Sequence, residues 1–349
     1  MKRTALPISF LLLFASVASL QESEQKHASE ASRVVATYTP APTETVNAAS
    51  MSAAAGAFLD SLSDELRARA ALELDDPERK NWTNVPPRAD ERGVRFGDLS
   101  EEQLERALDL MANVLSAEGY AQARDIMLGD DLLLRNGQAR TGFGVENFWL
   151  IVFGTPHAEQ KWALQLDGHH LALNITIEGE SLCMSPSFIG AQPADFTYGE
   201  RRSQPMKEAV DAAYALVQSL TDQQLEQARV AGRRGRIVTG PGRDGFVPEA
   251  AGLDCEALTD EQRALLGALI REFVQTLPEP HATKRMNELH VEIDDMWFAW
   301  SGSKESASDV SYRLQGPSLI VEYACQDLGG DPLDHLHSIY RNPLAEYGQ

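Results

Sequence analysis

The chain has 349 residues, and its 31 lysines and arginines against 52 aspartates and glutamates give a formal net charge of −21. Such an acidic chain lacks the basic surface that nucleic-acid binding requires. The apolar fraction of 43% excludes a wholly disordered chain, and the length allows one large domain or two medium ones.

The N-terminus has the order of a secretory signal peptide over residues 1–20. Lys2 and Arg3 precede an uncharged apolar run from Ala5 to Leu20, and polar residues follow from Gln21. Signal peptidase recognises this order, and the run is short for a membrane span, which needs about 20 apolar residues. An uncleaved membrane anchor is the alternative. We therefore expect a secreted or periplasmic protein with no membrane span after signal cleavage.

Residues 21–55 are rich in Ala, Ser, Thr, Glu and Pro and poor in large apolar side chains. This composition predicts a flexible tether. From residue 56 onward the composition is that of a globular protein, with no second linker of comparable length. We therefore expect a single globular domain over residues 56–349.

Three cysteines, Cys183, Cys255 and Cys325, are spread along this expected domain. An odd number in an exported protein permits at most one internal disulfide and leaves one thiol over. Their spacing does not decide the pairing, and no Cys/His pattern of a structural zinc finger is present.

Four segments share one phrase, a leucine followed by Ser or Thr and then acidic or amide residues. They are residues 62–65, 99–103, 220–224 and 258–262. In the last three, a Gln follows the Ser or Thr by three residues, which is the capping box that begins a helix. A good helix start used four times is the simpler interpretation because the intervening lengths differ, and an internal duplication is the alternative.

Apolar runs bounded by Gly, Ser or Pro predict strands between the helices. The runs are residues 148–153, 162–166, 169–177, 296–300, 312–315 and 319–323. Because helices and strands come in blocks rather than in regular alternation, the sequence favours an α+β fold. We expect a single large domain with an antiparallel mixed sheet packed by several amphipathic capped helices.

Four of the eight histidines form two tight clusters, His169-His170 and His335-Leu336-His337. If residues 169–177 are a strand, its alternation places His169 with the apolar face and directs His170 and Asn174 to the polar face. His335 and His337 share a face in an extended chain, so both imidazoles can converge on one ion.

With His170 from a second strand, the later pair would complete a three-nitrogen site for a divalent transition metal, with one position open for catalysis. His169 is a further candidate ligand. The alternative is that these histidines are hydrogen-bonded residues of the core.

Glu322 lies in the apolar strand 319–323, where an unpaired carboxylate would be costly. A metal, an arginine or a protonated histidine would offset that cost. Arg313, Arg341 and the histidines are the candidate partners, and Arg341 is close to the later histidines in sequence. The structural alternative is a simple pair between Glu322 and an arginine.

Seven segments occur in an order that resembles one known family. They are 148–156 (FWLIVFGTP), 168–174 (GHHLALN), 185–190 (SPSFIG), 298–302 (FAWSG), 312–316 (YRLQG), 320–323 (IVEY) and 335–341 (HLHSIYR). The combination of GHH-x3-N with a late H-x-H-x3-R is similar to the bacterial, fungal and plant family catalogued as domain of unknown function 3500, from about Phe58 to the C-terminus.

This resemblance implies no established activity. It places weight on one set of residues: His169, His170, Asn174, Glu322, His335, His337 and Arg341. One position departs from the family pattern, which often has Asn before the late histidine pair, where this chain has Asp334.

Three hypotheses follow. In the first, the chain is an exported metal-dependent enzyme, a hydrolase rather than an oxidase because no redox cofactor motif occurs. Glu322 would then be a ligand or the general base, Arg341 would bind an anionic substrate group, and Asn174 would support the site. In the second, it is a non-catalytic extracytoplasmic module that binds a metal or small ligand. In the third, these polar residues form a buried structural network.

Overall fold

The structure is a computed structural model that describes residues 28–41, 46–86, 93–137, 141–230, 236–327 and 330–349. The expected signal peptide, residues 1–20, lies outside the described residues. The helices in the described part of the chain are α2 (Glu30–Thr37), α3 (Ala48–Ser61), α4 (Asp64–Ala70), α5 (Glu101–Val114), α6 (Ala117–Arg135), α7 (Lys207–Ser219), α8 (Asp222–Ala228), α9 (Asp260–Val274) and α10 (Glu279–Val291). The strands there are β1 (Ala71–Leu72), β2 (Val94–Arg95), β3 (Trp149–Phe153), β4 (Trp162–Gly168), β5 (Leu171–Glu178), β6 (Ser181–Ala191), β7 (Phe196–Tyr198), β8 (Arg201–Ser203), β9 (Leu253–Asp254), β10 (Trp297–Ser301), β11 (Ser311–Gln315), β12 (Ile320–Cys325) and β13 (Leu336–Arg341).

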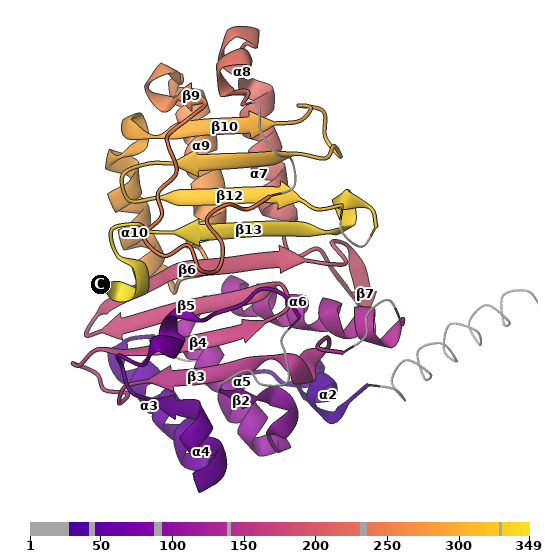
Figure 1. Cartoon of the computed structure of the whole chain (residues 1–349), viewed down its shortest axis with the longest axis vertical. Helices are drawn as coiled ribbons and strands as arrows, with labels where there is room; N and C mark the ends of the chain where they lie inside the picture. The colour runs from indigo at the N-terminus through magenta and orange to yellow at the C-terminus, as the bar shows by residue number, and fades with distance from the viewer. Residues whose placement is uncertain (1–27, 42–45, 87–92, 138–140, 231–235, 328–329) are drawn as a thin grey trace, which may run out of the picture.

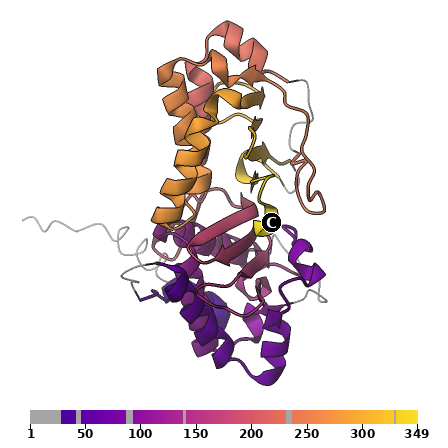
Figure 2. The same ribbon diagram turned by 90° about the vertical axis from the view of Figure 1, so that its left-hand side faces the viewer.

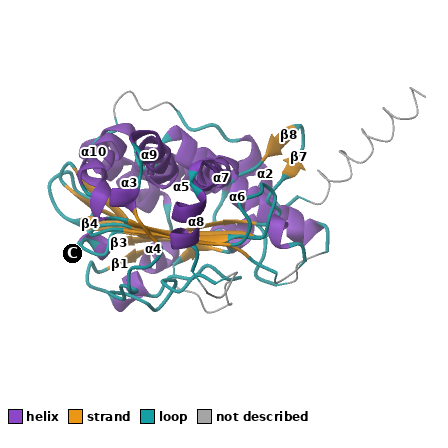
Figure 3. Cartoon of the chain, turned by 90° about the horizontal axis from the view of Figure 1, so that it is seen from above, coloured by secondary structure: helices purple, strands orange, loops and turns teal. Residues whose placement is uncertain are grey.

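Among the described residues, 11 strands form one mixed sheet in the order β1-β3-β4-β5-β6-β13-β12-β11-β10-β9, with β2 also paired to β3 (Figure 1). The pair β1–β3 is parallel, and the other pairs of this sheet are antiparallel. Most helices gather on one face of the sheet, where the main apolar core lies (Figure 3). The predicted α+β fold, one domain with a mixed sheet packed by helices, is confirmed.

The opposite face of the sheet is covered by loops and by the C-terminal segment (Figures 2 and 3). A second apolar cluster lies there, formed by Phe188 and Ile339 of the central strands with Trp82 and Tyr347 from the covering segments. Burial on both faces explains why strands such as β3, β4 and β12 are buried along their whole length rather than at alternate residues. We call this side the loop-covered face.

The four repeated phrases all begin helices. Ser63, Ser100, Thr221 and Thr259 are the N-caps of α4, α5, α8 and α9. The last three form capping boxes with the Gln at the third helical position, as the sequence predicts.

Part of the segment expected to be a flexible tether is folded. Helix α2 and the start of α3 lie within residues 21–55, and Val35 and Met51 are 0% and 1% exposed. The hydroxyl of Ser32 also donates to Asp131, at 2.7 Å. The tether prediction is therefore wrong for these helices, because a few apolar side chains per turn are enough to anchor a short amphipathic helix that composition alone does not reveal.

The sheet contains two copies of one arrangement. Apart from β1, which has no counterpart in the second copy, the order α3-α4-β2-α5-α6-β3-β4-β5-β6 returns as α7-α8-β9-α9-α10-β10-β11-β12-β13. The register returns as well, since Val94 pairs with Leu150 at one edge and Leu253 with Phe298 at the other. The copies meet where β6 and β13 run antiparallel. This matching order and register favours an internal duplication over four independent helix starts.

The unequal spacing of the phrases has a structural reason. Ser63 and Ser100 of the first copy are separated by nearly the same length of chain as Thr221 and Thr259 of the second. The interval that differs runs from the second phrase of the first copy to the first phrase of the second, and it is longer because it contains β3 to β6, the β7–β8 hairpin and α7.

Candidate metal centre

His169 and His170 form the turn between β4 and β5 rather than the start of a strand. Gly168 ends β4 and pairs with Leu171, the first residue of β5. His170 has a φ of 66°, in the left-handed region that a turn residue can occupy. The predicted alternation of the two histidines along a strand is therefore wrong, and both side chains are buried.

The turn places His170 against the beginning of β13. The Nε2 atoms of His170 and His335 are 2.9 Å apart, and those of His335 and His337 are 3.0 Å apart. One ring nitrogen from each residue lies within 4.8 Å of the other two. The structure thus brings together the three histidines that the sequence groups.

This donor set suits a divalent transition ion. Two nitrogens bound at 2.0–2.1 Å in tetrahedral geometry lie about 3.3 Å apart, so each of the pairs at 2.9 and 3.0 Å needs to separate by only a few tenths of an ångström. Burial lowers the pKa of His337 to about 3 and holds the pKa of His170 well below its usual range. Neutral imidazoles offer the lone pairs that a metal ion requires.

Asp130, which the sequence analysis missed, fixes the turn from α6. Its Oδ1 lies 2.6 Å from Nδ1 of His169, and its Oδ2 accepts the backbone N–H of Gly144 at 2.7 Å. His169 in turn stacks on His170, with ring centroids 3.7 Å apart. His169 is therefore placed behind His170, outside the group of three converging nitrogens. The signal in the sequence was the acidic pair Asp130-Asp131 inside the apolar stretch of a helix.

Asn174 is not joined to the histidines. It lies in the interior of β5, where its side chain accepts from Gln165 at 2.8 Å and donates to the carbonyl of Pro186 at 2.9 Å. Asn174 therefore links β5 to β4 and β6 on the loop-covered face.

Glu322 accepts hydrogen bonds from a covering loop rather than from an arginine or a histidine. Its Oε2 accepts the backbone N–H groups of Val238 and Thr239, both at 2.9 Å, and the Thr239 hydroxyl at 2.7 Å. In the β12–β13 register Glu322 is diagonal to His337, on the same face of the sheet.

Arg341 holds the same loop from β13. It is 1% exposed, forms an ion pair with Glu346, and donates to the carbonyl oxygens of Thr239 and Phe246. None of these contacts involves the three converging histidines. Thr239 therefore links Glu322 and Arg341 into one network that fastens the loop to the sheet.

Fold and site together define a single-domain α+β protein with a duplicated sheet and a cluster of three histidines, two of them buried, where the copies meet. A family model described as "Protein of unknown function (DUF3500)" matches residues 44–349, so the chain belongs to this family. Neither a curated protein nor a solved structure matches the chain. Asp334, the departure from the family pattern, accepts the backbone N–H of Ala194 at 2.9 Å just before His335.

Proposed function

We propose that this protein is an exported metalloprotein that binds a divalent transition metal through His170, His335 and His337 and uses it in hydrolysis. The observation that carries the proposal is the convergence of three imidazoles, one from a turn and two from the beginning of a neighbouring strand. In the part of the chain that the structure describes, no helix has the length and apolar character needed to cross a bilayer.

A bound divalent ion supplies Lewis acidity to a water molecule or a substrate oxygen. The chain's own residues set the site around it. His170 and His335 are buried while His337 is partly exposed, so the open position belongs on the His337 side. Glu322, diagonal to His337 on the same face, is the proposed proton acceptor, and Arg341 and Asn174 hold the surrounding backbone in place.

The burial of two of the three ligands favours a second candidate function. His170 is 1% exposed and His335 is 5% exposed, which also suits a module that holds a metal without catalysis. The two functions share the metal centre and differ only in turnover.

The first test is elemental analysis of protein purified without a His-tag, before and after reconstitution with zinc, copper, iron or manganese. We expect close to one ion per chain in the wild type and none in His335→Ala. His290→Ala is the matched control, because His290 is exposed on α10 and should leave metal content unchanged. Absence of a stoichiometric metal under all conditions refutes the proposal.

The second test separates hydrolase from binding module. A panel of ester, amide and phosphoester substrates is screened with the metal-loaded protein and with His337→Ala. Turnover that disappears with His337→Ala supports the hydrolase, whereas a loaded protein inert on the panel supports the non-catalytic module.

Export is tested by fractionating cells that express the full chain and a chain lacking residues 1–20; only the former should leave the cytoplasm.

A further inference from the structure

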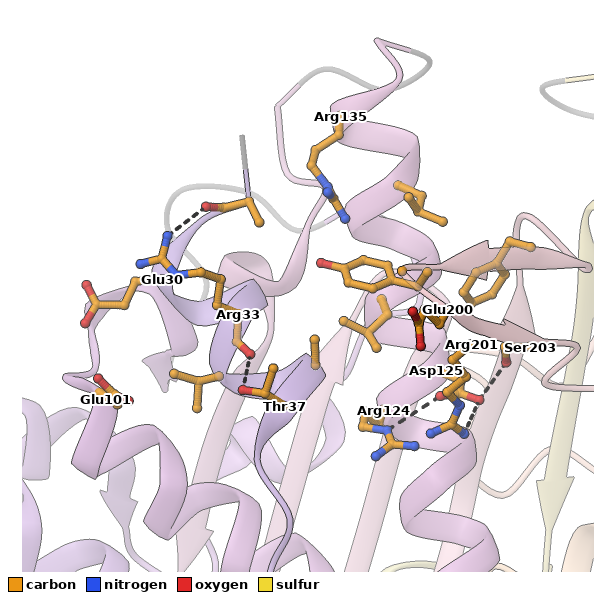
Figure 4. A pocket seen from close by; sticks show the side chains of 18 residues that line it. Glu30, Arg33, Thr37, Glu101, Arg124, Asp125, Arg135, Glu200, Arg201 and Ser203 are labelled. Carbon is orange, nitrogen blue, oxygen red and sulfur yellow. Dashed lines mark hydrogen bonds and ion pairs between the residues drawn. The ribbon is translucent and has the colours of Figure 1, made fainter. Parts of the chain in front are cut away.

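The cavity between α2, α6 and the β7–β8 hairpin has a volume of about 890 Å³, but the charges on the wall made by α6 and the hairpin are compensated. Asp125 pairs with Arg201 at 2.8 Å and lies 3.6 Å from Arg124 (Figure 4). Arg135 pairs with Asp131 at 2.8 Å. Each arginine of this wall is therefore already placed against an aspartate, and the wall does not select an acidic ligand.

A smaller cavity has a different charge balance. Its volume is about 200 Å³, and it is lined by the start of β6, the end of β13 and one side of α10. This is the opposite end of the β6–β13 pair from the three converging histidines, close to the C-terminus (Figure 1). The volume is below that of sites for drug-sized ligands, about 300–1,000 Å³, so the cavity suits a small molecule.

The internal duplication makes this cavity the counterpart of the metal centre. The β4–β5 hairpin ends in the pair Gly168 and Leu171. The β11–β12 hairpin ends in the same pair of residue types, Gly316 and Leu319. Counted from these pairs, the positions of His170, His335 and His337 are those of Ser318, Ser181 and Cys183 in the other copy. Two hydroxyls and a thiol replace three imidazoles, so the counterpart lacks the donor set of the metal centre.

Two buried hydroxyl groups of this cavity accept a hydrogen bond but have no acceptor for their own hydrogen among the described residues. The Tyr340 hydroxyl accepts from Nε of Arg285 at 2.9 Å, and the Ser185 hydroxyl accepts from the backbone N–H of Asn342 at 2.8 Å. Tyr340 is 7% exposed and Ser185 is 0% exposed. Because a buried donor without an acceptor is costly, both groups point to a ligand that accepts hydrogen bonds.

The lining of the cavity carries one uncompensated positive charge. Arg285 pairs with Glu288 at 3.1 Å, and its remaining N–H groups donate within the protein. The side chain of Lys284 has no ion-pair or hydrogen-bond partner among the residues that the structure describes. His281 is half-buried, and burial lowers its pKa, so it is neutral at pH 7. The cation available to a ligand is therefore Lys284, whose ammonium group has three donors.

We infer that this cavity binds a small monocarboxylate with a short apolar chain. The carboxylate accepts from Tyr340, Ser185 and Lys284, and its single negative charge matches the single positive charge of the lining. The chain packs on Leu182 and Leu277. These apolar residues favour a ligand with a carbon chain over an inorganic ion. This inference goes beyond the metal centre and does not depend on it.

The test is isothermal titration of the full chain with butyrate and with its neutral isostere butyramide. We expect saturable one-to-one binding of butyrate and about tenfold weaker binding of butyramide, because hydrogen bonds to a charged group are the stronger ones. Lys284→Gln should weaken butyrate binding about tenfold and leave butyramide binding unchanged. Since Lys284 is exposed, this variant should fold as the wild type does. Lys304→Gln, in the loop after β10 and outside the cavity, is the matched control.

Two further titrations locate the ligand. Tyr340→Phe keeps the ring and removes one donor, so it should weaken butyrate binding about fivefold. His335→Ala should bind butyrate as the wild type does, and a loss of binding there would place the carboxylate at the metal centre and overturn the inference. Absence of saturable butyrate binding, equal affinity for butyrate and butyramide, or unchanged binding in Lys284→Gln overturns it as well. Tighter binding of inorganic phosphate than of butyrate also contradicts it.

Discussion

Gly190 on β6 lies directly opposite His337 on β13. A side chain at Gly190 would point between the imidazole rings of His170 and His337. A Cβ atom at Gly190 would lie 3.0 Å from Cδ2 of His170, 3.1 Å from Cδ2 of His337 and 2.8 Å from the carbonyl oxygen of Leu336. The last of these contacts is with backbone, which cannot rotate away. The three histidines converge only because this strand position has no side chain.

Gly190→Ala is expected to disrupt the metal centre while leaving the fold intact. The added methyl group forces the rings apart and shifts the β6–β13 pair, at a cost of about 1–3 kcal/mol in the free energy of unfolding. Metal content after reconstitution, measured beside urea unfolding, checks both effects. Gly267→Ala on α9 is the control, because a Cβ there meets nothing within 4 Å and should raise stability by up to about 1 kcal/mol. Wild-type metal affinity in Gly190→Ala would contradict this account of the site.

Asp130→Asn is expected to weaken metal binding without removing a ligand. The carboxylate orients His169, whose ring supports His170 by stacking. Partners hydrogen-bonded directly to a ligand typically change metal affinity by about 10–100-fold, and Asp130 acts one residue further away, so we expect a loss of about tenfold or less. Asp131→Asn is the adjacent control: Asp131 contacts Ser32, Tyr198 and Arg135 instead, so it should cost stability but not metal affinity. Equal losses of affinity in both variants would show that α6 acts only through general stability.

The predictable parts of this protein are those that local chemistry determines. The capping boxes at Ser100, Thr221 and Thr259 involve residues three apart, and each begins a helix as expected. The apolar runs predict strands because they too depend only on residues that are close together in the sequence. The prediction that His169 and His170 begin a strand was wrong. In a sheet buried on both faces, the residues of a turn have the same apolar neighbours as the residues of a strand, and only Gly168 indicated that β4 ends there.

The site depends on contacts between distant segments that spacing does not encode. Asp130 reaches His169 from a helix of the same copy, where its carboxylate lies against the ring nitrogen. At the equivalent place in the second copy, Arg285 of α10 donates to the carbonyl of Ser318, in the turn between β11 and β12. In both copies a helix residue therefore holds the equivalent hairpin turn, through a carboxylate in the first copy and a guanidinium in the second. Only the first copy has histidines in that turn.

Glu322→Ala is expected to loosen the loop that contains Val238 and Thr239 and covers this face of the sheet. The substitution leaves three donors of Val238 and Thr239 without their acceptor, which costs about 2–5 kcal/mol in the free energy of unfolding. Glu322→Gln keeps an acceptor oxygen and should cost about 1 kcal/mol or less. Both variants should retain the metal after reconstitution, so loss of the ion in Glu322→Gln would instead identify Glu322 as a ligand. Chemical denaturation and elemental analysis of the same samples give the two readings.

The three cysteines are expected to remain reduced thiols of low reactivity. Cys183, Cys255 and Cys325 are unpaired in the structure, and burial raises the pKa of each thiol, that of Cys255 to about 12. Because the thiolate is the reactive form, native protein at pH 8 should react slowly with Ellman's reagent. Cys183, the one partly exposed thiol, should react first, although it donates to the carbonyl of Ala345 at 3.0 Å. After denaturation without reductant all three should titrate, and a count of one would reveal a disulfide that this fold does not contain.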